Sequence, residues 1–264
     1  MGRTARPRGP AVTFANLYLL RELIKRDLVA RFTGSTLGFL WAVIQPITLV
    51  AVYWFVFTFM IPVRGLQIGG DEYIYFLIAG LLPWLAISEG IVRSMTSMID
   101  NGPVVRKIPM RSELLVMVPN ASAIIFEAIA IGVFVVLLML KRGMPGKLWL
   151  LPLALILQFA LQFGVALFLA AAYVFFRDLG QLLGFALSIA FYLSPILYPA
   201  TGRFAEYFAW NPMTPLLGLF RSAMLSAALP EVTSIVFLLA FATAISVAGW
   251  LFFRRAQPAL IDLI

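Results

Sequence analysis

The chain contains neither cysteine nor histidine among its 264 residues, and only 12% of its residues are charged. Without cysteine there is no disulfide framework and no thiol nucleophile, and without histidine there is no imidazole base and no ordinary zinc site. The low charge excludes a disordered tail or a coiled coil. No internal repeat is visible, so the inverted repeats of many secondary transporters find no support.

Apolar residues, by contrast, make up 62% of the chain, and the mean hydropathy is +0.97. A soluble domain is roughly 45–50% apolar and has too little interior to bury such an excess, so the sequence predicts a membrane protein. Continuous apolar runs favour helices over barrel strands. We expect an all-α fold with one transmembrane domain, residues 37–264. Its six spans are predicted near 37–61, 73–92, 114–140, 148–175, 179–198 and 232–253.

Residues 1–36 are predicted to form a cytoplasmic N-terminal segment with an amphipathic helix over Thr13–Phe32. Apolar residues recur in it at helical spacing, and basic residues fill its other faces. So many charges prevent a span and favour a position in the headgroup layer, where the basic side chains meet phosphate. A plain juxtamembrane linker is the alternative. The basic residues of this helix that we single out are Arg21, Lys25, Arg26 and Arg31.

The distribution of lysine and arginine sets the expected orientation. With both termini in the cytoplasm, fourteen of these residues lie inside and six outside, which agrees with the positive-inside rule. The same rule accounts for the net charge of +8, so we expect no nucleic-acid partner. A group on the outside, Lys141, Arg142 and Lys147, goes against the bias.

The stretch between Ser194 and Pro230 is too long for a tight loop and too often interrupted by proline to span. Short apolar pieces separated by prolines suggest half-helices that re-enter the membrane from the outer face. Such backbone is tolerated at membrane depth only where protein covers it or a cavity adjoins it. A loose extracellular loop is the alternative.

Few residues offer catalytic chemistry. The turn Gly143–Lys147 lacks the spacing and the hydroxyl residue of a phosphate-binding loop, so ATP binding by that route is excluded. Glu127 falls within a predicted span, where it serves as part of a gate or polar track, or as a hydrogen-bonded strut between helices. The only adjacent acidic pair, Asp71-Glu72, is the basis for the alternative of a membrane-embedded acyl- or glycosyltransferase. We expect no metal site.

A series of short motifs resembles the permeases of type-2 ABC exporters for polysaccharides, the family of O-antigen, capsule and teichoic acid exporters. The similarity covers about Thr13 to Arg255, and its motifs occur in the family's order. They are Leu37-Gly38-Phe39-Leu40-Trp41 with Gln45-Pro46, Asn101 to Pro109, Phe176-Arg177-Asp178, Tyr192 to Pro199, and Trp210-Asn211-Pro212 with Pro215 and Leu219 to Arg221.

The resemblance implies a homodimer in the bacterial inner membrane that pairs with two copies of a separate ATPase and moves a lipid-linked glycan. ATP and magnesium would then belong to the partner, with no cofactor on this chain. An exporter of another lipid or drug is the alternative. The implied coupling residues are Asn101, Val105, Arg106, Lys107, Ile108, Pro109 and Arg111, and those for substrate access are Arg21, Lys25, Arg26 and Arg31. The channel and outer gate would use Trp41, Glu127, Tyr192, Tyr198, Pro199, Asn211, Pro212 and Arg221.

Overall fold

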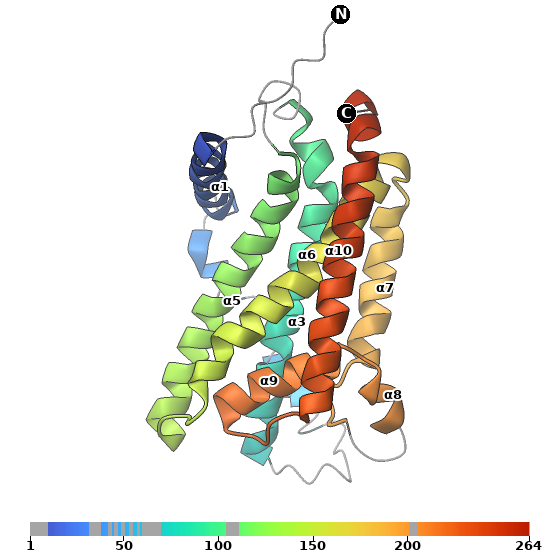
Figure 1. Ribbon diagram of the computed structural model, residues 1–264. Coiled ribbons are helices and arrows are strands. Elements are labelled where there is room, and N and C mark those ends of the chain that lie inside the picture. Colours follow the sequence, from blue (N-terminus) through green and yellow to red (C-terminus); the bar gives the residue numbers. More distant parts are fainter. Residues whose placement is uncertain are drawn as a thin grey trace, which may run out of the picture.

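The computed structural model describes residues 10–31, 38–41, 70–103, 111–200 and 205–263, with isolated residues between 44 and 59. Every regular element in that part of the chain is a helix, which confirms the all-α class (Figure 1). About half of the predicted span 37–61 lies outside the described residues. Of the coupling residues, Val105, Arg106, Lys107, Ile108 and Pro109 lie outside them as well.

Four long helices form the bundle: α3 (Gly70–Asp100), α5 (Glu113–Arg142), α6 (Leu151–Phe175, preceded by the short η3, Leu148–Leu150) and α10 (Val232–Leu263). Their apolar stretches contain 28 to 30 residues. At 1.5 Å per residue each reaches about 42–45 Å, more than a hydrocarbon core of about 30 Å requires. They confirm four predicted spans as helices able to cross a membrane, and α3 and α10 continue well past the predicted ends.

The fifth described apolar run differs from the prediction. Helix α7 (Leu179–Leu193) has 15 residues and ends before the predicted boundary at Tyr198. The cause is Pro195, because a proline disfavours the helical conformation of the residue before it. Ser194 accordingly has an extended backbone, with ψ at 147°. The apolar residues up to Leu197 remain buried, but in irregular backbone.

Helix α6 lies at the centre, in contact with α3, α5, α7, α9 and α10. Small residues allow this packing, since they let helix backbones approach closely. Alanines at four α6 positions are almost fully buried, and Gly164 of α6 packs against the backbone of α10 at Ser246. The Ser246 hydroxyl also donates to the Ala160 carbonyl at 2.7 Å. Helix α10 contacts little besides α6.

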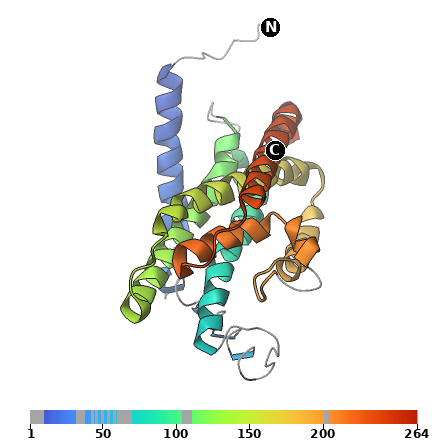
Figure 2. The same cartoon turned by 60° about the horizontal axis from the view of Figure 1, so that its bottom comes forward.

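The N-terminal helix α1 (Pro10–Ala30) confirms the helix predicted over Thr13–Phe32. It is seen nearly end-on in Figure 1, beside long helices seen at full length, and it is seen at full length in Figure 2. The helix is therefore steeply inclined to the bundle and packs on it chiefly through α5. It lies at the end of the bundle where α10 finishes, which we call the α1 end.

At the opposite end, two short helices follow α7: α8 (Ala205–Ala209) and α9 (Met213–Leu225). Helix α9 lies across the bundle rather than along it (Figure 1), and most of its side chains are buried. It ends at Ser226, whose φ of 55° is left-handed. The stretch predicted to hold half-helices therefore does contain short helices.

Candidate functional site

Charged side chains join the end of α1 to α3. Arg31 contacts the Glu89 carboxylate at 2.6 Å, and Arg93 contacts Asp27 at 2.6 Å and Glu89 at 3.4 Å. Nearer the end of the bundle, Arg26 donates to the Asn101 side chain at 3.4 Å. We call Asp27, Arg31, Glu89 and Arg93 the α1–α3 clasp. Because these groups are only partly exposed, water screens their attraction less than on an open surface.

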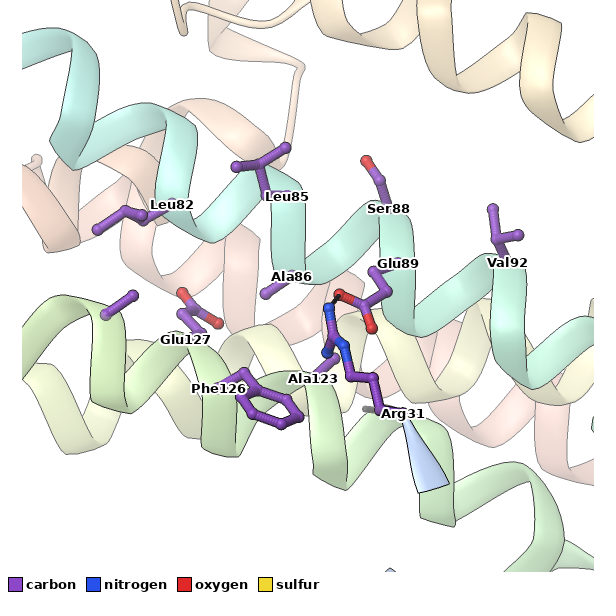
Figure 3. Close-up of a pocket in the computed structure, with 11 residues that line it drawn as sticks. Arg31, Leu82, Leu85, Ala86, Ser88, Glu89, Val92, Ala123, Phe126 and Glu127 are labelled. Atoms are coloured by element: carbon purple, nitrogen blue, oxygen red, sulfur yellow. Dashed lines mark hydrogen bonds and ion pairs between the residues drawn. The ribbon is translucent and has the colours of Figure 1, made fainter. Parts of the chain in front are cut away.

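Beside the clasp, a pocket of about 490 Å³ lies between α3 and α5. Figure 3 shows Arg31 reaching between Glu89 of α3 and Phe126 of α5. Its guanidinium carbon lies 4.4 Å from the centre of the Phe126 ring, a cation–π distance. Glu127 lines the same pocket and is only 4% exposed. The pocket thus has acidic groups within a mostly apolar wall and one guanidinium at its edge.

The interior side of α5 carries a polar layer shared with α3 and α6. Gln158 of α6 donates to one Glu127 oxygen. Two turns away, the Asn120 amide donates to the Ser94 hydroxyl at 2.5 Å, and Ser94 donates to the Val116 carbonyl at 2.9 Å. Interhelical bonds of this kind hold membrane helices in register. The strut interpretation of Glu127 is therefore supported by its contact with Gln158.

At the opposite end of the bundle, side chains bind carbonyl groups in the last turn of α7 and just after it. Asn211 donates to the Leu193 carbonyl at 3.1 Å, and Tyr73 donates to that of Leu197 at 3.0 Å. The Tyr198 hydroxyl donates to the Tyr192 carbonyl. Irregular backbone in a membrane needs internal partners of this kind. These bonds would let the segment after α7 lie at membrane depth.

Arg221 of α9 holds the same segment. Its side chain is 8% exposed, donates to the Ile196 carbonyl at 3.1 Å and lies 3.5 Å from the centre of the Phe76 ring. Gly80 of α3 makes the room, because a Cβ there would lie 2.7 Å from the Arg221 Nη2. Arginine suits this position, since its planar guanidinium group can stack on an aromatic ring and donate hydrogen bonds to a carbonyl group at the same time.

The profile of ABC-2 type transporters matches residues 18–225, which is most of the chain. The chain belongs to the ABC-2 type transporter family.

Curated relatives of this ABC-2 transporter match along most of their own lengths. An O-antigen export system permease protein RfbA from Klebsiella pneumoniae is 29% identical, over 80% of this chain and 82% of the relative. The RfbA protein of Myxococcus xanthus is 26% identical over 93% and 95%. A polysialic acid transport protein KpsM from Escherichia coli is 23% identical over 92% and 95%.

The residues predicted for substrate access do not form one cluster. Arg31 belongs to the clasp and the pocket, whereas Lys25 and Arg26 line a shallow groove on α1. Arg21 lines another hollow, with Ile125 of α5. Of the coupling residues, Asn101 directly follows α3, and Arg111 is exposed before α5. These two flank the part of the predicted coupling segment that lies outside the described residues.

The predicted gate residues divide into two groups. Tyr192, Tyr198, Asn211 and Arg221 come together around carbonyl groups at and just after the end of α7. Pro199 and Pro212 belong to the same stretch, and Pro212 directly precedes α9. Glu127 lies apart from them, in the α3–α5 pocket with Arg31. Trp41 is exposed, next to η1 (Gly38–Leu40).

Several structurally important residues were not among the predicted site residues. Arg93 and Asp27 complete the clasp, Phe126 forms the pocket wall, and Tyr73 binds the segment after α7. A signal was present for two of them: Asp27 is four residues before Arg31, and Glu89 is four residues before Arg93. This spacing places each pair on one helix face. Phe126 and Tyr73 carried no comparable signal, because aromatic residues are abundant throughout the chain.

Proposed function

We propose that this chain is the permease subunit of an ATP-driven exporter that moves a lipid-linked polysaccharide across the bacterial inner membrane. The observation that carries the proposal is the match to ABC-2 transporters, together with relatives named for O-antigen export and polysialic acid transport. ATP hydrolysis then belongs to a separate ATPase, and the chain by itself is not an enzyme. Both termini lie in the cytoplasm in this proposal, so the α1 end is the cytoplasmic end.

Assembly as a homodimer with two ATPase subunits supports the transport of a bulky glycan. A polar glycan needs a path shielded from lipid, and a single helix bundle of this size is too small to enclose one. Two copies related by a closed two-fold axis could enclose such a path. The membrane-embedded transferase remains the second candidate, but its acidic pair is disfavoured because Arg142 contacts Glu72 at 3.4 Å.

The deciding experiment is purification of the chain together with a candidate ATPase and reconstitution into vesicles. We expect ATP hydrolysis only in the complex, and ATP-dependent movement of a lipid-linked glycan to the opposite leaflet. Transferase activity of the chain alone, without any partner, would contradict the proposal.

The coupling segment, Asn101–Arg111, provides the sharpest test of the ATPase partner. Charge reversal in Arg106→Glu/Lys107→Glu should release the ATPase, because a basic docking turn loses its attraction to the partner. Lys141→Glu, at the other end of α5, is the matched control and should leave the complex intact. Copurification and vesicle insertion measure the two outcomes separately. A double variant that still copurifies at wild-type stoichiometry would remove Asn101–Arg111 from the interface.

The proposed outer gate comprises the hairpin Pro199–Leu229, with Tyr192 and Tyr198 just before it. Because the chain has no native cysteine, single cysteines placed there report on access without interference. We expect a cysteine between Tyr198 and Phe220 to cross-link to its twin or to react with a polar reagent from outside. The cross-link should stop export while ATP still binds. Protection of every position, without cross-links, would show that the gate lies elsewhere.

A further inference from the structure

The α3–α5 pocket holds a carboxyl oxygen without a donor. Glu127 receives the Gln158 amide on one oxygen, while its Oε1 is buried and finds no hydrogen-bond partner among the described residues. An unsatisfied carboxyl group at membrane depth is costly, and such a group is commonly part of a binding site. Because Glu127 lines a pocket of about 490 Å³, a bound ligand could supply the missing donor.

The depth of this pocket follows from helix geometry. Arg142 of α5 and Glu72 of α3 contact each other, and we take this charged pair as one membrane boundary. Glu127 is 15 residues from Arg142, about 22 Å along the helix, and Glu89 is 17 residues from Glu72, about 25 Å. In a core of about 30 Å, both carboxyl groups then lie about 5–8 Å inside the other boundary, at the α1 end. That is close beneath the lipid headgroups of this leaflet.

The charges are ordered along the membrane normal. Glu127 is the deep acidic group, whereas Glu89 lies nearer the α1 end and is paired with Arg31 at the pocket's edge. Farther out, Arg26 contacts Asn101 at the end of α3. A ligand that fits this order has a cation inside and an anion outside. Its hydrocarbon would continue onto α5, whose Ile125 and Ile129 are exposed.

We propose that the α3–α5 pocket binds the headgroup of an ethanolamine phospholipid, with the ammonium group against Glu127 and the phosphate toward Arg31. The ammonium supplies N–H donors for Glu127 Oε1. The phosphate meets basic side chains at headgroup depth. A lipid-linked glycan fits less well, because no cation accompanies its phosphate and the deep end of the pocket is acidic. The site is thus additional to the proposed transport path.

The test measures which lipid the full chain retains. The protein is placed in nanodiscs with equal parts of phosphatidylethanolamine, phosphatidylcholine and phosphatidylglycerol, and bound lipid is counted by native mass spectrometry. We expect retained phosphatidylethanolamine to exceed phosphatidylcholine, whose methylated nitrogen has no N–H. Glu127→Gln should weaken retention about tenfold, as expected for loss of a hydrogen bond to a charged group. Glu113→Gln is the control, since Glu113 is on the same helix and contacts Arg254 instead.

A second variant guards against misfolding of Glu127→Gln. Ala86→Leu adds bulk to the pocket wall and leaves Glu127 and Gln158 unchanged, and it should abolish retention in a monodisperse protein. If phosphatidylglycerol were retained as well as phosphatidylethanolamine, a hydroxyl donor would serve as well as the ammonium group, and the proposal would be overturned. Retention that survives both pocket variants would place the lipid elsewhere and overturn it too. Neither result depends on glycan export, so failure here leaves the proposed transport function untouched.

Discussion

Gly164→Ala tests the close contact between α6 and α10. A Cβ at this position would lie 2.6 Å from the Ser246 nitrogen and 2.7 Å from the Ile245 carbonyl carbon. Non-bonded carbon atoms are at their optimum near 3.5–4.0 Å, so the two backbones must separate by about 0.8 Å or more. A side chain could rotate away from such a clash, but backbone cannot. The substitution should therefore displace one helix from the other.

The expected cost is that of an overpacked core, typically about 1–3 kcal/mol. Separation also stretches the Ser246 bond to the Ala160 carbonyl, and bonds between membrane helices average about 0.6 kcal/mol. We therefore expect a loss of about 2–3 kcal/mol. For a protein of this size, about 2–4 °C of melting temperature corresponds to each kcal/mol, so the midpoint should fall by about 4–12 °C.

The assay is thermal unfolding of the purified chain in detergent, followed by loss of the monodisperse peak. Gly132→Ala in α5 is the matched control, because a Cβ there meets nothing within 4 Å. Gly249→Ala is a second variant from the α10 side and should behave like Gly164→Ala, since its Cβ would overlap the Gly164 carbonyl. If Gly164→Ala and Gly132→Ala melt together, α6 and α10 do not pack as described.

Three further substitutions have expected results. Gly80→Ala should lower the melting temperature by several degrees, because its Cβ would displace Arg221 Nη2 and break the hydrogen bond to the Ile196 carbonyl. An unchanged midpoint would contradict this position of the Arg221 side chain. Arg93→Gln should raise hydrogen exchange in α1 about fivefold through loss of about 1 kcal/mol of pairing with Asp27, and unchanged exchange would show that the clasp does not hold α1. Asn120→Ala should cost about 1 kcal/mol in chemical denaturation by removing an interhelical hydrogen bond, whereas no change would mean that the polar layer contributes no stability.

The helices were largely predictable from sequence, because each signal was local. Long apolar runs fix α3, α5, α6 and α10, and Gly143 ends α5 as expected of a residue that adopts a φ of 85° at low cost. The sequence also contained a signal for the end of α7, namely the proline that follows Ser194. The apolar residues that follow masked it, since hydropathy does not distinguish a buried helix from buried irregular backbone.

The partners of the charged residues were not predictable, because they depend on which helices become neighbours. Arg31 was assigned to lipid phosphate by its place on a basic helix, whereas the structure pairs it with Glu89, 58 residues away. Glu127 was placed with the outer gate because a charged residue in a span suggests a transport path. The structure gives it a hydrogen bond from Gln158 of α6, and it lines the α3–α5 pocket together with Arg31.

The two ends of the bundle are stabilised by different kinds of interaction, and this difference bears on which end can move. At the α1 end, the clasp joins partly exposed ions, whose pairing energies are about 1 kcal/mol or less and can be replaced by phosphate or water. At the other end, Arg221 and Tyr73 bind buried carbonyl groups, which would be left without partners if the contact opened. Between the two ends of the bundle, the backbones of α6 and α10 are in close contact at Gly164, so these helices must move apart before one can slide along the other. Displacement of α1 relative to α3 should therefore cost less than displacement of α9, so we expect α1 to respond first to changes in lipid.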